Sequence, residues 1–460
     1  MLSEDNLVQA PNPARMAAPD MTSLADALLS RLFPICRSIT GDGVRQTLRI
    51  LKEVVPFDTY EVPTGTTCFD WQVPNEWTIR DAFIADLNGV RIVDFKKCNV
   101  HVVSYSEPVD AELTFDELKP HLHTHEQDPD AIPYRTTYYK RSWGFCLSRR
   151  QFESLDRSAR YRVKIDATLA PGSLTYGERV LRGTSDREYL VSTYCCHPSL
   201  ANDNLSGIVL WTLLLSTLAK RTLQHTYRFV IVPETIGSIV YLSINANAMR
   251  SVRGGFVVST VGGPGGFSYK RTFETDAAID RVVRQTFLER DIPFKEHPFD
   301  LLGSDERSYS GPGFRIPVGT IAKDKYYEYP QYHTSLDNLD FVKASAIIET
   351  LDLYLHAIEI LEQDRTYVSQ LPGGEPQLGK RGLYPQAVGG SITPANRSRR
   401  HDAPSATDKV SALLSAAFWA DGQTSLLTVA ERSGLPVAAL FDAAQRLAAA
   451  GVLREVTPRA

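Results

Sequence analysis

The sequence has no stretch approaching the roughly 20 apolar residues that a helix needs to cross a bilayer, so no membrane span is expected. Residues 1–23 contain early acids and no apolar run, which is unlike a signal peptide or a membrane anchor. A disordered leader and a cytoplasmic location are therefore expected. The chain also lacks an excess of positive charge, since its formal net charge is -4, and this gives no general reason to expect binding to nucleic acid or to an anionic membrane.

Cysteine is scarce and scattered along the chain. The 460 residues include six cysteines without a CxxC pair, which disfavours a cysteine-rich zinc site and a disulfide framework. The adjacent Cys195 and Cys196 are expected to be buried residues at the end of a strand rather than redox partners. What the chain does have is 43% apolar residues and enough length for two or three globular domains.

Apolar strands alternate with segments of helix length from Glu188 onward, and this pattern predicts a doubly wound α/β layer with a mixed sheet. Residues 23–55 are predicted to form two further helices, because their helical apolar spacing is broken by Pro34 and by the turn at 41–43. The strands of the α/β layer are expected at 189–195, 227–232 and 255–260, and its helices at 207–220 and 276–290.

Residues 61–166 have a different sequence pattern, with short β-type runs such as 91–95 and 100–105. This pattern favours an inserted all-β domain. The α/β domain is then discontinuous, formed by residues 23–60 and 167–370. An exposed edge on the insert would suit a homo-oligomer. Residues 371–403 are rich in Gly, Pro and Arg without periodicity, which indicates a linker or strap.

Residues 404–460 are expected to form a winged helix-turn-helix module. Three helices, at 410–420, 425–433 and 436–450, precede a short strand at 451–456. The third helix offers only Arg446 as a cation, whereas a surface that follows a phosphate backbone needs several. Docking to another protein is therefore favoured over binding to nucleic acid.

The first candidate site follows the expected strand at 189–195, where the turn His-Pro-Ser-Leu-Ala-Asn-Asp carries His197 and Asp203. In open α/β sheets, sites gather at the carboxyl ends of strands. Imidazole and carboxylate are both good zinc ligands. The pair alone is also compatible with an ordinary turn.

Two more residues favour a metal site. Glu234 follows the strand that ends at Val232, so its carboxylate reaches the same edge of the sheet and could accept a proton from an activated water. An acid that stabilises a helix N-terminus is the alternative interpretation. His333, in a polar loop, would complete a His, Asp, His ligand set with one position open for water, although alone it could be the exposed cap of a helix.

The order of these motifs resembles that of the zinc aminopeptidase superfamily. More closely, the chain resembles a family of bacterial aminopeptidase-like proteins with an inserted β-domain and a winged-helix tail, over nearly its whole length from about Ser23. Segments 71–77 and 138–146 resemble signatures of that inserted domain. The motifs are His-Pro with Asp-Asn-x-Ser-Gly at 197–207, Pro-Glu-x-x-Gly-Ser at 233–238, Gly-Ser-Asp-Glu at 303–306 and Tyr-His-Thr-Ser-x-Asp at 332–337.

The resemblance implies histidine ligands at His197 and His333, a bridging aspartate at Asp203 and a general base at Glu234. The superfamily usually has a second Glu after the base and an Asp after a later strand, whereas this chain has Thr235 and Ser259 there. Two neighbouring cations would then lack the negative charge that holds them together. One zinc ion per chain is expected.

The missing ligands leave room for Asp305 or Glu306 to bind the ion or to orient a histidine. A salt bridge to Arg307 or Arg315 is the alternative. Candidates for the wall of a substrate cleft, or equally for surface packing, are Arg271, Tyr326, Tyr327 and Tyr329.

A second group of histidines alternates along the insert, at His121, His123 and His125. On a strand this spacing would place all three on one face, where they could bind a metal. A solvated acidic loop is the more ordinary interpretation.

The function expected from these residues is that of a zinc-dependent hydrolase of aminopeptidase type, which cleaves a peptide bond or a small amide with Glu234 as general base. Two alternatives remain open. One is acyl transfer or deacylation of a small amide with a single zinc, as glutaminyl cyclases do on a related scaffold. The other is a binding or scaffold protein that kept the fold without catalysis.

Overall fold

The computed structural model describes residues 18–383 and 406–456. Most of the expected leader and residues 384–403 of the expected linker lie outside the described residues. The first helix, α1 (Ala18–Leu32), begins inside the segment that was expected to be leader. No helix in the described part of the chain is long and apolar enough to span a membrane.

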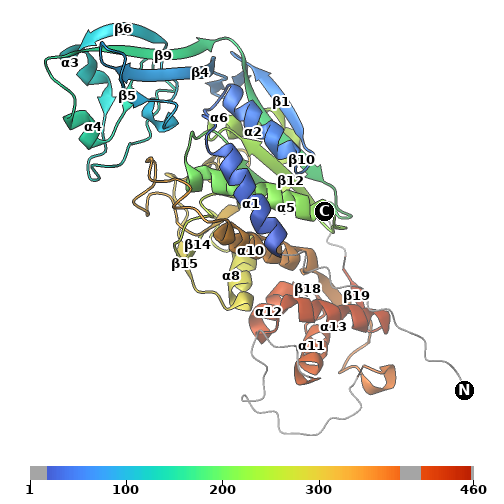
Figure 1. The fold of residues 1–460 in the computed structure, drawn as a ribbon. Helices are drawn as coiled ribbons and strands as arrows, with labels where there is room; N and C mark the ends of the chain where they lie inside the picture. The colour runs from blue at the N-terminus through green and yellow to red at the C-terminus, as the bar shows by residue number, and fades with distance from the viewer. Residues whose placement is uncertain (1–17, 384–405, 457–460) are drawn as a thin grey trace, which may run out of the picture.

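An eight-stranded mixed sheet forms the centre of the molecule (Figure 1). Its strand order is β1-β10-β12-β11-β13-β16-β14-β15, and the neighbours from β12 to β16 pair in parallel. The predicted doubly wound mixed sheet is therefore confirmed. The strands are β1 (Asp58–Pro63), β10 (Ser173–Leu181), β11 (Glu188–Tyr194), β12 (Thr226–Val232), β13 (Val252–Val257), β14 (Phe267–Lys270), β15 (Phe294–His297) and β16 (Val318–Ala322).

Helices cover both faces of this sheet, which explains why β11 is buried along its whole length. Val191 packs into the core on one face and Leu190 into the core on the other. Trp211 of α5 is fully buried and donates its indole N–H to the carbonyl of Val191 at 3.0 Å. The first face carries α1, α2 (Asp42–Lys52), α5 (Gly207–Leu218), α8 (Ala278–Arg290) and α10 (Ala344–Gln363), and the second carries α6 (Ile236–Ile244), α7 (Ala246–Met249) and α9 (Glu306–Tyr309).

A four-stranded antiparallel sheet, in the order β5-β4-β9-β6, forms the insert at the upper left of Figure 1. The insert is not formed by strands alone, because capping boxes at Thr114 and Ser148 begin two short helices. Its elements are β2 (Thr67–Cys68), β3 (Trp71–Gln72), β4 (Glu76–Ala85), β5 (Arg91–Asp94), β6 (Val109–Thr114), α3 (Phe115–Leu118), β7 (Leu122–His123), β8 (Phe145–Cys146), α4 (Arg149–Glu153) and β9 (Arg160–Ala170).

The strand predicted at 100–105 is wrong. The segment starts in a 3-10 turn, η1 (Asn99–His101), and continues with isolated bridges at Val102 and Ser104. All six of its residues are buried, so its apolar content reflects burial on every side rather than one face of a sheet. His101 fixes the turn through Nδ1, which lies 2.7 Å from the carbonyl oxygen of Cys146.

The carboxyl-terminal module has the predicted winged-helix elements and packs below the α/β domain (Figure 1). Its apolar core is continuous with that of the α/β domain, because Leu427 and Leu440 belong to the same cluster of buried residues as Leu361 of α10. Its sheet has the order β18-β17-β19, and β17 follows α10 directly. The elements are β17 (Thr366–Ser369), α11 (Ala406–Phe418), β18 (Asp421–Ser425), α12 (Leu426–Ser433), α13 (Val437–Ala449) and β19 (Leu453–Glu455).

Candidate metal centre

The four residues predicted to form the site come from three loops at one edge of the parallel sheet. His197 follows β11, and Glu234 follows the adjacent parallel strand β12. Asp203 lies in the kinked segment η3 (Ala201–Ser206), whose backbone is non-helical at Asp203 and Asn204 and which leads into α5. His333 belongs to the loop between β16 and α10.

Three of these side chains bring their donor atoms together. Oδ2 of Asp203 lies 3.0 Å from Nε2 of His333 and 3.8 Å from Nε2 of His197. All three donor atoms lie within 4.8 Å of one another, as expected for ligands of a single metal ion. The carboxylate of Glu234 lies beside this group, with Oε2 at 3.9 Å from Nε2 of His197.

Asp203 is held rigidly and in its charged form. The Tyr194 hydroxyl donates to Oδ1 at 2.5 Å, which leaves Oδ2 to face the histidines. Burial opposes its ionisation, but His197, His333 and the Tyr194 hydrogen bond outweigh it and lower the pKa of Asp203 to about 2. The backbone of the same turn is held by Asp337, whose carboxylate accepts the N–H groups of Asn202 and Asp203 at 2.6 and 2.9 Å.

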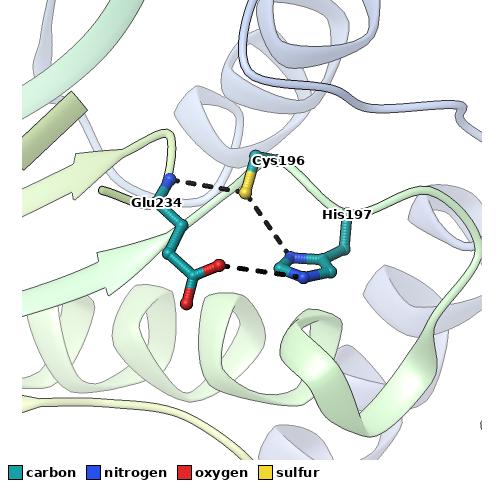
Figure 2. Close-up of side chains that lie close together, drawn as sticks. All are labelled: Cys196, His197 and Glu234. Carbon is teal, nitrogen blue, oxygen red and sulfur yellow. Dashed lines mark hydrogen bonds and ion pairs between the residues drawn. The ribbon is translucent and has the colours of Figure 1, made fainter. Parts of the chain in front are cut away.

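His197 is fixed through its ring and through its backbone. Figure 2 shows Sγ of Cys196 between the Nδ1 atom of His197, at 3.5 Å, and the backbone N–H of Glu234, at 3.3 Å. The Nε2 atom therefore faces the donor group. The guanidinium of Arg37, only 1% exposed, donates to the carbonyls of His197 and Pro198 at 2.9 and 2.8 Å. Burial lowers the pKa of His197 to about 4, so the ring is neutral, the form that binds a metal.

Glu234 is the one carboxylate of the site that reaches the adjoining pocket. Its side chain keeps 29% of its surface exposed. Burial of the carboxyl group, with the negative charges of Asp305 and Asp203, raises its pKa to about 8. A carboxyl group with that pKa can both take up and release a proton near neutral pH.

Two residues at the site have an unusual backbone conformation, His333 and the Thr235 that follows Glu234. His333 and Thr235 have φ angles of 54° and 61°, in the left-handed region that branched residues such as Thr rarely adopt. Tyr332 stacks on the His333 ring with 3.9 Å between ring centroids. Such backbone conformations persist only where the surrounding structure fixes them, and they cluster at functional sites.

A small pocket of about 160 Å³ opens from Glu234 and His333. Tyr327, which the sequence suggested as a wall residue, lines it, whereas Arg271 does not and instead lies 3.3 Å from Glu296. The pocket is lined by Tyr194, Glu234, Thr235, Leu302, Gly303, Ser304, Arg307, Tyr326, Tyr327, Tyr332 and His333.

Asp305 and Glu306 lie outside the donor group. Oδ1 of Asp305 accepts the backbone N–H of Thr235 at 2.7 Å and the hydroxyl of Ser238 at 2.9 Å, which places it at the start of α6. Glu306 accepts from the Thr320 hydroxyl at 2.7 Å and lies 3.7 Å from Nζ of Lys270. Neither residue contacts a histidine of the site or pairs with Arg307 or Arg315 among the described side chains.

The histidines of the insert do not form a second metal group in the described part of the chain. His121 stacks on Trp143 with 3.6 Å between centroids, and its Nδ1 lies 3.0 Å from the Trp143 carbonyl oxygen. His125 accepts the backbone N–H of Asp128 through Nδ1. The ordinary interpretation as a polar loop is the one that these contacts support.

Several residues that build the site were not predicted from the sequence. Asp337 stood in the same motif as His333, and its place four residues after a ligand was the available signal. Tyr134 comes from the insert, with its ring centroid 5.1 Å from that of His197 and 5.2 Å from that of His333. Arg37 and Tyr134 lie far from the site in sequence, so no local pattern marks them.

The fold and the site together define an aminopeptidase-like α/β protein with a winged-helix module. Residues 26–364 match the family described as "Domain of unknown function (DUF4910)", and residues 365–455 match a winged helix-turn-helix family. The chain belongs to the first of these families, and the second match confirms the carboxyl-terminal module.

Known relatives agree with this assignment. A Clostridium acetobutylicum protein, provisionally named a polysaccharide biosynthesis protein with aminopeptidase-like domain, is 42% identical over 91% of this chain and 93% of its own length. A crystal structure from the same organism, provisionally described as a peptidase, has a TM-score of 0.85 at 40% identity and covers 95% of this chain and 98% of that one. A zinc aminopeptidase from Bacillus subtilis shares the fold, with a TM-score of 0.53 at 12% identity over 75% of this chain and 95% of that one.

Proposed function

We propose that the chain is a zinc-dependent amide hydrolase of aminopeptidase type that uses one metal ion. Two imidazoles and one carboxylate are typical zinc ligands, and they leave a fourth position open. Two donor atoms of a tetrahedral zinc stand roughly 3.3 Å apart. The separations of Asp203 Oδ2 from the two histidines, 3.0 and 3.8 Å, lie on either side of that value.

The surroundings support one ion rather than two. Thr235 stands where the superfamily usually has a second glutamate, and its hydroxyl accepts a hydrogen bond from Arg307 at 3.1 Å. Ser259 is fully buried, and its hydroxyl has no hydrogen-bond partner in the part of the chain that the structure describes. Neither side chain is anionic, and the carboxylate of Asp305 is bonded to the start of α6 instead. A second cation would lack the charge needed to hold it.

Different residues of the chain serve in metal binding and in proton transfer. When bound, zinc supplies Lewis acidity, which polarises a carbonyl and lowers the pKa of a water. Glu234, beside the donor group, accepts a proton from the attacking water and returns it to the leaving nitrogen. Tyr194 and Asp337 keep Asp203 in place during this exchange.

The position of Glu234 beside the donor triad carries this proposal, and Glu234→Gln tests it. The substrate panel consists of aminoacyl anilides, N-acyl amides and N-acyl amino sugars. The zinc-loaded wild-type protein is first tested on each class. On the class that it hydrolyses, the variant should have a kcat at least about 100-fold lower while it still binds zinc. The matched control is Glu274→Gln, an exposed residue outside the pocket, which should retain full activity.

Undiminished hydrolysis by zinc-loaded Glu234→Gln would contradict the mechanism. If the wild-type protein binds no zinc, and added zinc or cobalt gives no hydrolysis of any class, the chain is a binding or scaffold protein.

Deacylation of a small amide, such as an N-acyl amino sugar, is a second candidate. Four tyrosines line the pocket, and phenol rings can pack on the C–H face of a sugar ring while their hydroxyl groups hydrogen-bond to its polar groups. The provisional name of the Clostridium acetobutylicum relative, which refers to polysaccharide biosynthesis, supports the same class. Hydrolysis of N-acyl amino sugars in preference to aminoacyl anilides would favour this candidate.

A further inference from the structure

The pocket beside Glu234 has an unusual charge balance for a site that would bind a peptide amino terminus. Its lining contains one carboxylate, Glu234, and one permanent cation, Arg307. A substrate ammonium group needs an acidic partner, and the only carboxylate of the lining is already required for proton transfer. The charge of the lining that is left to bind a ligand is therefore the positive charge of Arg307.

Arg307 is positioned toward this pocket without a carboxylate partner. Its guanidinium donates to the Thr235 hydroxyl at 3.1 Å and to the carbonyl of Leu301 at 3.3 Å. Both acceptors are neutral, and no carboxylate of the described residues lies within 4.0 Å of it. The side chain is therefore held in place while its charge stays available.

The neighbouring cations are different, because they are already neutralised. Lys270 lies 3.7 Å from both Asp300 and Glu306, and Lys325 lies 3.6 Å from Asp300. A methyl group added at Gly303 would lie 2.0 Å from Nζ of Lys270, so this lysine is directly behind the pocket wall. Arg307 is the cation that can pair with a ligand.

A buried hydroxyl group on the same wall also lacks a partner. Tyr326 is 4% exposed, and its hydroxyl has no hydrogen-bond partner among the described residues. The Ser304 hydroxyl instead interacts with the Glu234 carboxyl. A buried hydroxyl without a partner costs free energy, which a polar ligand atom would recover. The Tyr326 hydroxyl can donate to an anion that Arg307 binds.

We infer that the acyl part of the substrate carries a carboxylate, which Arg307 binds with the help of the Tyr326 hydroxyl. This inference rests on the proposed function, which places the scissile carbonyl at the zinc site. The planar guanidinium matches a carboxylate through two parallel hydrogen bonds. A volume of about 160 Å³ corresponds to roughly five water molecules, which suits a short chain between the two groups.

Equilibrium binding to the zinc-loaded full chain tests this without any turnover. The probes are succinate, butanoate and 4-aminobutanoate, which share one carboxylate for the zinc end and differ in the charge of the other end. Calorimetry should show that succinate binds at least about tenfold more tightly than butanoate, and that 4-aminobutanoate binds most weakly.

Substitutions then identify the residue that causes the preference for succinate. Arg307→Gln should bring the affinities for succinate and butanoate close together, whereas Arg271→Gln, an arginine outside the pocket that is paired with Glu296, should keep the preference. Thermal melting of both variants shows that each is folded. Equal binding of succinate and butanoate by the wild type, tightest binding of 4-aminobutanoate, or an undiminished preference in Arg307→Gln would overturn the inference.

Hydrolysis separates this inference from the proposed function. The substrates are the p-nitroanilides of succinic, butanoic and 4-aminobutanoic acid, and the first should have the highest kcat/KM through a lower KM. Glu234→Gln should abolish hydrolysis yet keep the preference for succinate in binding. If the protein binds succinate preferentially but hydrolyses none of the anilides, only the proposed function is contradicted. If it hydrolyses the anilides without preferring the succinyl compound, only this inference is contradicted.

Discussion

His197 takes its orientation from a sulfur atom. A metal-binding histidine usually donates its other ring N–H to a carboxylate or a carbonyl. Here the acceptor is Sγ of Cys196, at 3.5 Å from Nδ1, and the same sulfur accepts the N–H of Glu234. Burial, with the charge of Glu234, raises the pKa of the Cys196 thiol well above its ordinary value, so the sulfur is a neutral acceptor. One atom thus positions the proposed metal ligand and the proposed general base together.

Replacing this sulfur should weaken metal binding. We expect Cys196→Ala to lower zinc affinity by about 10- to 100-fold, because His197 loses the partner that fixes its tautomer and ring angle. Competition with a chelator measures the affinity. The matched control is Cys195→Ala, which removes the neighbouring sulfur from the core on the other face of the sheet and should leave zinc affinity unchanged. Equal losses in the two variants would argue against a positioning role for Cys196.

The sequence located the residues whose roles follow from strand ends, and it missed those whose roles depend on distant contacts. His197 and Glu234 follow adjacent parallel strands, so their proximity could be predicted. Arg37 is 160 residues away from the carbonyl of His197 that it holds. No periodicity or local spacing encodes such a contact.

At the scale of elements, one partly buried ion pair joins three helices. Glu289 of α8 accepts from Nε2 of His356 of α10 at 2.8 Å and from the backbone N–H of Val437, at the start of α13, at 2.9 Å. Burial opposes the charging of His356, but Glu289 and Glu359 outweigh it and raise its pKa. The pair connects the α/β domain with the winged-helix module.

This ion pair should make stability depend on pH. The contribution of His356 is fully present below its unfolded pKa of about 6.5 and is lost as the pH rises through its higher folded pKa. We expect His356→Gln to cost about 1–2 kcal/mol in the free energy of unfolding at pH 6 and clearly less at pH 9. Urea unfolding at the two pH values measures this difference. A cost that is the same at both pH values would contradict the role of the charged pair.

The long helices and the strands of the parallel sheet were predictable because continuous apolar runs and helical spacing mark them. The turn at Asn99–His101 was not predictable, because a segment that is buried on all sides has the same apolar composition as a strand. The kinked backbone of the segment at Ala201–Ser206 was also not predicted. Its backbone is set by Asp337, more than 100 residues later, rather than by its own sequence.

At the scale of the whole molecule, the insert completes the site. The backbone N–H of Tyr134 donates to the carbonyl of His333 at 2.7 Å, and Ile132 and Ser335 exchange hydrogen bonds beside it. Tyr134 also packs with Leu200 of the turn that carries Asp203. The insert therefore fixes two of the loops that hold the donor group.

Removing the Tyr134 ring should loosen both histidines. We expect Tyr134→Ala to lower zinc affinity by about tenfold or more, because the ring contacts the imidazoles of His197 and His333. Tyr134→Phe keeps the ring and loses only the hydroxyl, which lies 2.9 Å from that of Tyr138. Its zinc affinity should stay close to that of the wild type. A loss in Tyr134→Phe as large as that in Tyr134→Ala would show that the hydroxyl, and not the ring, matters.

The most direct test of a single-zinc site is anomalous diffraction at the zinc edge from crystals of the full chain grown with excess zinc. We expect one strong peak, within bonding distance of Nε2 of His197, Oδ2 of Asp203 and Nε2 of His333, with Glu234 beside it and not bound. Two peaks a few ångströms apart, or a peak bound by Asp305 or Glu306 in place of one of the three donors, would contradict the single-zinc site.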